Sequence, residues 1–387
     1  MTTLDFRSDP TRSATRDLQL FRLQLQPHLD AFIARKLEVY TNYSDDPFLA
    51  LLLAHAAKLA SGNGKRIRPY VAHLMFKAQG GEGDETSLLI ALELFHLFCL
   101  VHDDIIDRGT RRYDLPTTQR FIFDELQREN RPGDAAHHEH IAVSQAMLLG
   151  DLIFSWSQES FHATRAFPDE SLALAQIYFG RMMDEVVIGQ MIDVDMTAQS
   201  DTSLEVIRRK LALKTASYTF IRPLQIGAAL AGRGRECEKF CAELGLALGV
   251  AFQLQDDLLD LLGTSAQTHK TVMSDLREGQ HTYFTQYIRE CGTDAERADL
   301  SALLGSDLQP NDRARVTALF VSSGAVEHGR QVVRDYLDSA ARAIEQAKLA
   351  APFQEKFCDL VEMVEQRAPL LELAVNDARE NAVLARR

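Results

Sequence analysis

The sequence predicts an all-α protein, a single large helical bundle around a central cavity. Apolar residues recur at helical spacing in one segment after another, and no convincing strand run is present. The chain shows no internal repeat of fixed period. Most prolines stand at segment ends, where a helix tolerates them. The cavity of such a bundle is lined by side chains that project inward from facing helices.

Residues 1–17 predict a flexible N-terminal segment, and residues 18–387 predict the all-α domain. The expected helices span 18–40, 47–59, about 69–79, 93–107, 141–166, 169–193, 203–230, 236–262, 311–320, 332–348 and 353–384. Pro223 lies inside one of them and predicts a kink there.

Residues 121–140 are polar and contain Pro132-Gly133, so we expect a long loop or insertion between helices. Three histidines, His137, His138 and His140, fall on this stretch. Without a cysteine or a helical pair four residues apart, they favour a solvated cluster over a metal site.

Composition and charge limit the possible functions. Of the 387 residues, 46% are hydrophobic and 25% are charged, which is typical of soluble globular proteins. No apolar run reaches the ~20 residues of a transmembrane helix, and the N-terminus does not resemble a signal peptide. The net charge of −13 argues against nucleic acid as a partner. Five cysteines without metal-ligand spacing favour free thiols in a reducing cytoplasm.

A cluster of carboxylates ends the helix expected over residues 93–107. Asp103 and Asp107 are four residues apart, so they project from one face a turn apart, and Asp104 lies beside them. His96 lies two turns upstream on nearly the same face. Three crowded carboxylates repel one another, and a cation such as Mg²⁺ would relieve that repulsion. Taken alone, the pattern is equally typical of a solvated acidic helix end.

The same spacing of three carboxylates returns in residues 252–260, FQLQDDLLD. Asp256, Asp257 and Asp260 follow another apolar helical run, at residues 244–254. Gln253 shares a helical face with Asp256 and Asp260 by the i, i+3, i+7 rule. Two such clusters, each ending an apolar helix, favour cation binding over two solvated faces.

With further motifs in the same order along the chain, the two clusters resemble the trans-prenyltransferases, the isoprenyl (polyprenyl) diphosphate synthases. The resemblance covers roughly residues 40–290. The other motifs are GKRIRP at 64–69, RR at 111–112, GQMID at 189–193, KTASY at 214–218 and K…DLREG at 270–279. Each motif is weak by itself, but their order is specific.

The resemblance implies a magnesium-dependent condensation. An allylic diphosphate ionises, the double bond of isopentenyl diphosphate attacks the carbocation, and loss of a proton leaves a product five carbons longer. The family's ligands for about three Mg²⁺, which would hold one diphosphate between two facing helices, match Asp103, Asp107, Asp256 and Asp260. The cationic contacts to that diphosphate match Arg111, Lys214 and Lys270. The contacts to the second diphosphate match Lys65, Arg68, His96 and Arg112.

Three more residues match family positions that surround the carbocation: Thr215, Tyr218 and Gln253. Lys214 beside them interrupts the nearly uncharged stretch LALKTASYTF, which favours an anionic partner for its ammonium. The cations of GKRIRP at an expected helix start oppose the helix dipole, and a bound anion would resolve that conflict.

Product length in the family depends on bulky residues below the first carboxylate cluster. The two positions concerned are Phe98 and Cys99, and Phe95 lies a turn further down. One aromatic residue followed by a small one resembles the C20 producers, so geranylgeranyl diphosphate is the expected product and farnesyl diphosphate the next. Phe95 would shorten the product tunnel further.

Several positions depart from the family pattern. Three residues instead of the usual four separate Asp107 from Arg111. The usual glycines are replaced by Tyr113, His269 and Ser274, and a common lysine by Gln280. These departures affect the arginine positions and one cationic contact, but neither carboxylate cluster.

Two alternatives stay open. A class I terpene cyclase would share the all-α cavity, but it would lack GKRIRP and carry a different second metal motif. A non-catalytic subunit of another prenyl synthase would be expected to lose aspartates, whereas this chain keeps all six. By analogy with the family, we expect a homodimer.

Overall fold

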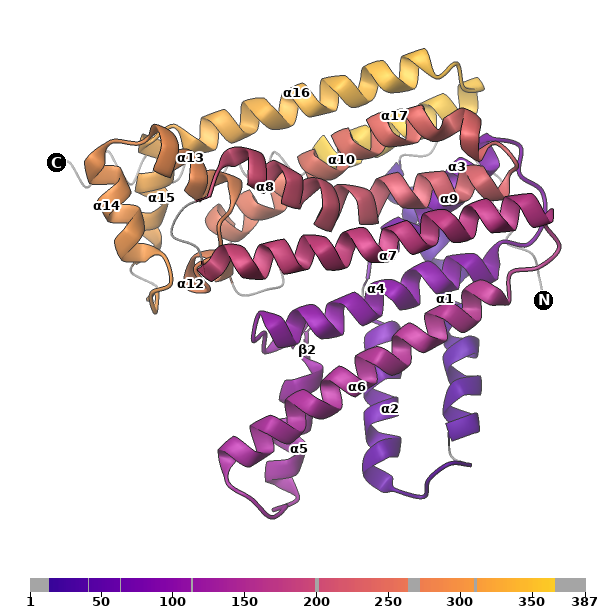
Figure 1. Ribbon diagram of the computed structural model, residues 1–387, viewed down its shortest axis with the longest axis horizontal. Helices are drawn as coiled ribbons and strands as arrows, with labels where there is room; N and C mark the ends of the chain where they lie inside the picture. Colours follow the sequence, from indigo (N-terminus) through magenta and orange to yellow (C-terminus); the bar gives the residue numbers. More distant parts are fainter. Residues whose placement is uncertain are drawn as a thin grey trace. The chain divides into compact units, whose positions relative to one another are not determined.

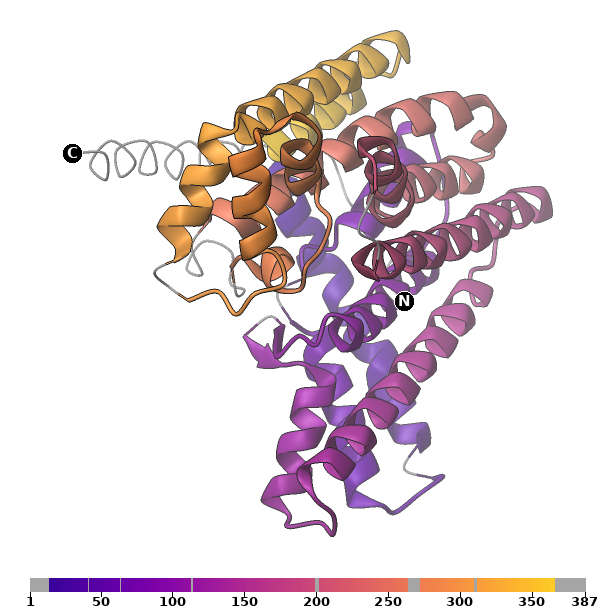
Figure 2. The same ribbon diagram turned by 60° about the vertical axis from the view of Figure 1, so that its left-hand side comes forward.

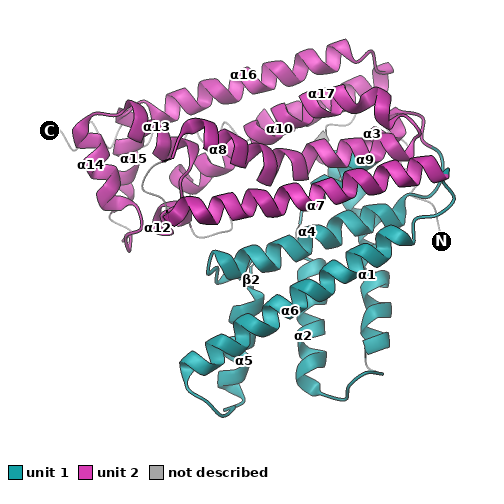
Figure 3. Cartoon of the chain, in the orientation of Figure 1, with its two compact units in different colours: residues 1–9, 16–73, 82–168 teal, residues 10–15, 74–81, 169–387 magenta. Residues whose placement is uncertain are grey.

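The computed structural model describes residues 14–40, 42–62, 64–112, 114–198, 202–263, 272–309 and 312–365. The chain forms two compact units (Figure 3). Of the described residues, unit 1 contains 16–73 and 82–168, and unit 2 contains 14–15, 74–81 and those from 169 onward.

Unit 1 is built from long helices and one short hairpin. Its elements are α1 (Ala14–Tyr40), α2 (Pro47–Ala60), the first part of α3 (Ile67–Ala78), α4 (Thr86–Ile106), β1 (Arg111–Arg112), β2 (Leu115–Pro116), α5 (Thr118–Arg128) and α6 (Ala135–His162). The hairpin is antiparallel, with Arg112 paired to Leu115. Apart from this hairpin, the described chain is helical or irregular, as an all-α protein should be.

Helix α6 packs against α4 and α5 in unit 1. Its Ser157 and Ser160 hydroxyls each donate a 2.8 Å hydrogen bond to a backbone carbonyl of α4. Helix α5 runs beside α6 in both views (Figures 1 and 2). A buried apolar cluster joins α2, α5 and α6 through Leu52, Ile122, Leu126, Ala142 and Ala146.

The expected long loop over residues 121–140 is wrong. Residues up to 128 continue α5, and α6 begins at 135, so only the turn around Pro132-Gly133 is irregular. The polar composition concealed a narrow apolar stripe, since Ile122 and Leu126 lie four residues apart and are both buried. His138 is buried as well, with Nδ1 2.8 Å from Gln127, so the histidines do not form one solvated cluster.

Unit 2 is assembled around the long helix α10 (Gly234–Leu262) (Figure 1). Its other elements are α7 (Asp169–Ala198), α8 (Leu204–Lys210), the π-helix η1 (Leu211–Ile221), α9 (Arg222–Leu230), α12 (Ser274–Arg277), α13 (Tyr283–Cys291), α14 (Asp294–Leu303), α15 (Asp312–Ser322), α16 (Ala325–Gln346) and α17 (Ala351–Glu365). Helix α10 packs against η1, α9 and α16.

The expected helix over residues 203–230 is divided into α8, η1 and α9. The sequence did not predict that its central part would be a π-helix, a form often found at functional sites. Two glycines let η1 approach its neighbours closely. A Cβ on Gly189 of α7 would lie 2.7 Å from the backbone nitrogen of Lys214, and a Cβ on Gly249 of α10 would lie 2.2 Å from the Cα of Ala216. Glycine at these two positions therefore allows η1 to pack closely against both α7 and α10.

Several expected boundaries also shift. Helix α1 begins at Ala14, so the expected flexible start extends no further than the preceding residues, which lie outside the described chain. The helix expected from residue 93 already begins at Thr86. The hairpin was not expected. Residues 366–384 of the last expected helix lie outside the described residues.

Candidate functional site

The first carboxylate cluster ends α4 in unit 1. Asp103 and Asp107 are half-buried, and Asp107 caps the helix, with its backbone N–H donating to the Asp103 carbonyl at 2.8 Å. Asp104 is buried and has a different partner. The Arg112 Nε lies 3.1 and 3.2 Å from its two carboxylate oxygens, and the Arg112 Nη2 also donates to it. The structure thus separates the cluster into a helix-end pair and one aspartate that binds an arginine.

The two arginines of the hairpin have different surroundings. The Arg112 side chain is largely covered, whereas Arg111 is exposed and donates from Nη2 to the Asp114 carbonyl at 2.7 Å. Neighbouring residues of a strand project to opposite sides. The two predicted diphosphate contacts therefore point away from each other at the hairpin.

The GKRIRP segment leads into α3 and presents Lys65 exposed and Arg68 half-buried. Between them, Arg66 is buried and has the left-handed φ of 57°. Its Nη1 donates to Glu93 Oε1 at 2.7 Å, and its Nη2 donates to Gln26 Oε1 at 2.8 Å. This role was not predicted, although Glu93 on the apolar side of α4 was a signal that a buried cation was needed. Arg66 anchors the segment that carries the two predicted phosphate contacts.

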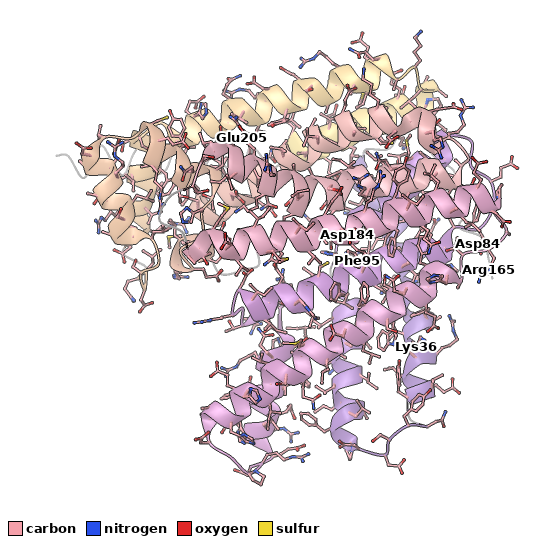
Figure 4. The ribbon with its side chains drawn as sticks, in the orientation of Figure 1. Lys36, Asp84, Phe95, Arg165, Asp184 and Glu205 are labelled. Carbon is pink, nitrogen blue, oxygen red and sulfur yellow. The ribbon has the colours of Figure 1, made fainter. Side chains whose placement is uncertain are left out.

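The predicted length-determining residues lie on α4, together with His96, which is half-buried. Phe95, labelled in Figure 4, is fully buried, whereas Phe98 and Cys99 are half-buried. The Phe98 ring centroid is 5.5 Å from that of Phe95 and 5.1 Å from that of Phe154 on α6. Phe154 was not predicted. It completes a cluster of three aromatic rings below the first carboxylates.

The second carboxylate cluster ends α10 in unit 2. Asp256 is half-buried and Asp257 is buried. A relay of hydrogen bonds leads to Asp257: the Thr215 hydroxyl donates to Gln253 Oε1 at 2.8 Å, and the Gln253 amide donates to Asp257 Oδ1 at 2.8 Å. Two of the residues predicted to surround the carbocation, Thr215 and Gln253, are thus hydrogen-bonded to each other. Tyr218, the third, is buried in η1.

Asp260 holds the turn that leads into α12. Its carboxylate accepts from the Ser274 hydroxyl at 2.7 Å and from the backbone N–H groups of Ser274 and Asp275, each at 3.2 Å. Met273 occupies the left-handed region, with φ of 59°. Asp260 was predicted only as a metal ligand, and its hydrogen bonds to this turn were not predicted. Lys270 lies outside the described residues.

Burial and like charge perturb this cluster. Burial raises the pKa of Asp257 to about 7, with Asp256 and Asp260 adding to the effect, against the hydrogen bond from Gln253 and the charge of Lys210. Burial, Asp260 and Asp257 raise the pKa of Asp275 well above its usual range. Crowded carboxylates of this kind are stabilised by a cation.

The donor chemistry of both clusters fits Mg²⁺. Each offers only carboxylate oxygens, the ligand type that this ion prefers, and the crowding in the second cluster calls for positive charge. In the chain as far as it is described, no three His, Cys, Asp or Glu side chains already converge on one ion position. The ligand assignments therefore stay predictions.

Lys214 has an anionic partner within unit 2. Its Nζ donates to Asp193 Oδ2 at 2.6 Å, and the Nζ of buried Lys210 donates to Asp193 Oδ1 at 2.8 Å. Although burial alone would raise the pKa of Asp193, the charges and hydrogen bonds of the two lysines lower it below its usual value. Asp193 is the last residue of GQMID, and the sequence analysis gave it no role. Lys210 was also missed.

A family model described as "Polyprenyl synthetase" matches residues 50–321. The chain belongs to the polyprenyl synthetase family. The matched span contains every residue predicted for the site. The identification made from the motifs, the all-α fold and the assignment to the transferases are confirmed.

Individual family members show the same relationship. The chain is 32% identical over 286 residues to a geranylfarnesyl diphosphate synthase of Aeropyrum pernix, covering 73% of this chain and 83% of that one. It is 27% identical over 291 residues to a geranylgeranyl diphosphate synthase of Sulfolobus acidocaldarius, covering 74% and 82%. A crystal structure of geranylgeranyl pyrophosphate synthase from Corynebacterium glutamicum, complexed with isoprenyl diphosphate and magnesium, superposes with a TM-score of 0.81 at 26% identity. The superposition covers 89% of this chain and 99% of that one.

Proposed function

We propose that this polyprenyl synthetase condenses isopentenyl diphosphate with an allylic diphosphate and releases inorganic diphosphate. The observation that carries the proposal is the presence of two complete carboxylate clusters, each at the C-terminal end of an apolar helix, in a chain of this family. The clusters carry Asp103 and Asp107 in unit 1, and Asp256 and Asp260 in unit 2. About three Mg²⁺, when bound, supply Lewis-acid stabilisation of the departing diphosphate.

Protein groups complete the allylic site. Lys214, Arg111 and Lys270 bind the allylic diphosphate by charge. Gln253 is held by hydrogen bonds to Thr215 and Asp257. In the proposal its amide oxygen stabilises the allylic cation as a dipole, without forming a covalent bond. No protein base is assigned, because the released diphosphate accepts the proton in the family.

The second substrate uses four cationic or polar side chains of unit 1, one of which is held by a buried carboxylate. Lys65, Arg68, His96 and Arg112 bind the diphosphate of isopentenyl diphosphate, and the guanidinium of Arg112 matches the fork geometry of a phosphate. Asp104 orients Arg112, and Glu93 orients the GKRIRP segment through Arg66. A bound anion at the start of α3 would also offset the unfavourable placement of cations near its N-terminus.

The proposed main product is geranylgeranyl diphosphate, with farnesyl diphosphate the next candidate. The support is the aromatic cluster of Phe95, Phe98 and Phe154 below the first carboxylates. A geranylgeranyl diphosphate synthase among the relatives is consistent with this length, whereas the geranylfarnesyl diphosphate synthase indicates that neighbouring lengths occur in the family.

We also propose a homodimer in the cytoplasm. Helix α7 exposes large apolar side chains along its length: Ile177, Val187, Ile188, Met191 and Val194. Such a stripe is typical of a surface covered by a partner. All five cysteines lie within the described residues, and none forms a disulfide, as expected in a reducing compartment. No described helix is long and apolar enough to cross a membrane.

The test is product analysis by mass spectrometry. Purified protein is incubated with Mg²⁺, isopentenyl diphosphate and each of the C5, C10 and C15 allylic diphosphates in turn. A C20 diphosphate as the end product is expected. A hydrocarbon formed from an allylic diphosphate alone would indicate a cyclase. A folded protein that elongates no starter would indicate a non-catalytic subunit.

A further inference from the structure

A buried lysine, Lys210, has no role in the proposed chemistry but shares the Asp193 carboxylate with Lys214. Lys210 ends α8, whose position is marked by Glu205 in Figure 4. Its Nζ donates to Asp193 Oδ1 at 2.8 Å and to the His281 carbonyl oxygen at 2.9 Å. A lysine is seldom fully buried unless a negative group accompanies it. Here one carboxylate, that of Asp193, serves two lysines.

The two lysines differ in exposure. The Lys210 side chain is 8% exposed and that of Asp193 6%, whereas the Lys214 side chain is 25% exposed. Lys210 is also fixed by a second acceptor, since the His281 carbonyl belongs to the segment after α12. Because its side chain is the more exposed of the two, Lys214 is the lysine that can leave Asp193, and the buried Lys210 is the one that stays.

The buried carboxylate makes the departure of Lys214 costly unless another cation remains. Removing one partner of a buried ion pair is strongly unfavourable, because the other charge is left without compensation. With Lys210 in place, Asp193 keeps one ammonium at 2.8 Å when Lys214 turns away.

We propose that Lys210 is a positioning residue: it compensates Asp193, so that Lys214 can transfer its ammonium from Asp193 to the diphosphate of the allylic substrate. The inference rests on the proposed function, which makes Lys214 a diphosphate contact. It assigns the last residue of GQMID to the control of that contact. The exchange breaks one ammonium–carboxylate hydrogen bond and forms one ammonium–phosphate hydrogen bond, and no covalent bond changes.

The test measures binding of inorganic pyrophosphate with Mg²⁺ by isothermal titration calorimetry, using the full chain. Lys210→Met keeps the length of the side chain but removes its charge, and weakens binding on the order of tenfold because Lys214 is then needed by Asp193. Asp193→Asn combined with Lys210→Met removes the carboxylate as well, which releases Lys214 and restores the affinity to within a few-fold of wild type. Lys210→Arg, which keeps the charge, retains most of the affinity.

The calorimetric stoichiometry distinguishes positioning from folding, because a folding defect of Lys210→Met lowers the number of binding sites per chain, whereas a loss of positioning weakens the affinity of each site. Wild-type affinity in Lys210→Met overturns the inference. So does a double variant that binds as weakly as Lys210→Met. Product elongation by the wild-type protein is measured as well. If the wild type elongates and either of these two results is found, only the inference is overturned. If the wild type neither elongates nor binds pyrophosphate, the proposed function is overturned with it.

Discussion

Asp104 should contribute to stability rather than to metal binding, although it lies in the same acidic motif as Asp103 and Asp107. Its carboxylate is 9% exposed and accepts two Nε contacts and one Nη2 contact from Arg112, which is 17% exposed. Hydrogen bonds to charged groups contribute about 1.5–3 kcal/mol each, and removing one partner of a buried pair costs more. Since Arg112 keeps some access to water, we expect Asp104→Ala to cost about 2 kcal/mol of the free energy of unfolding.

The assay compares three alanine variants by thermal unfolding and by the Mg²⁺ concentration that half-saturates pyrophosphate binding. Asp104→Ala should lower Tm by about 2–3 °C and change the Mg²⁺ requirement less than threefold. It should also raise the KM for isopentenyl diphosphate, because Arg112 loses its orientation. Asp103→Ala and Asp107→Ala are matched controls, and should raise the Mg²⁺ requirement with little effect on Tm. An Asp104→Ala protein of wild-type Tm that loses Mg²⁺-dependent binding would refute the reasoning.

Three further predictions follow from single side chains. Phe98→Ala removes the middle ring of the aromatic cluster and should lengthen the product by at least one five-carbon unit; an unchanged mass spectrum would contradict its assignment. Burial, with a smaller effect from Lys58, lowers the pKa of His55 to about 4. The unfolded chain then binds the proton more tightly, so stability is lost as pH falls from 6.5 toward 4, and His55→Phe should remove about 2 kcal/mol of the loss between pH 7 and pH 5. Equal pH slopes in urea unfolding would show that His55 is not responsible. A Cβ on Gly249 would lie 2.2 Å from the η1 backbone, so Gly249→Ala should destabilise by about 1–3 kcal/mol, whereas Gly180→Ala, with nothing within 4 Å, should be neutral or slightly stabilising; similar Tm values for the two variants would contradict the close packing.

Much of the architecture was predictable because long amphipathic helices reveal themselves in their apolar spacing. The α10 run that carries Gln253, Asp256 and Asp260 is an example, since its periodicity places the three polar residues on one face. The family motifs then supplied the expected chemistry. Helix α5 was not predicted because its fully buried apolar residues are few, Ile122 and Leu126, and the surrounding polar composition resembles that of a loop.

Partners that meet only in the folded chain could not be read from the sequence. Spacing alone does not distinguish Asp104, which binds Arg112, from the aspartates beside it. Helical propensity does not predict the π-helical geometry of η1, nor its close contacts with Gly189 and Gly249. In the same way, Lys210 looks like a surface residue of a basic stretch until Asp193 and the His281 carbonyl are placed around it.

The most direct measurement of the central claim is the stoichiometry of inorganic diphosphate release. Purified protein, Mg²⁺, isopentenyl diphosphate and an allylic diphosphate are combined, and the released diphosphate is counted against the isopentenyl diphosphate consumed. The account predicts one diphosphate for each isopentenyl diphosphate, none from either substrate alone, and none after chelation of the metal. Release from the allylic substrate alone, or no release from the complete mixture by folded protein, would contradict it.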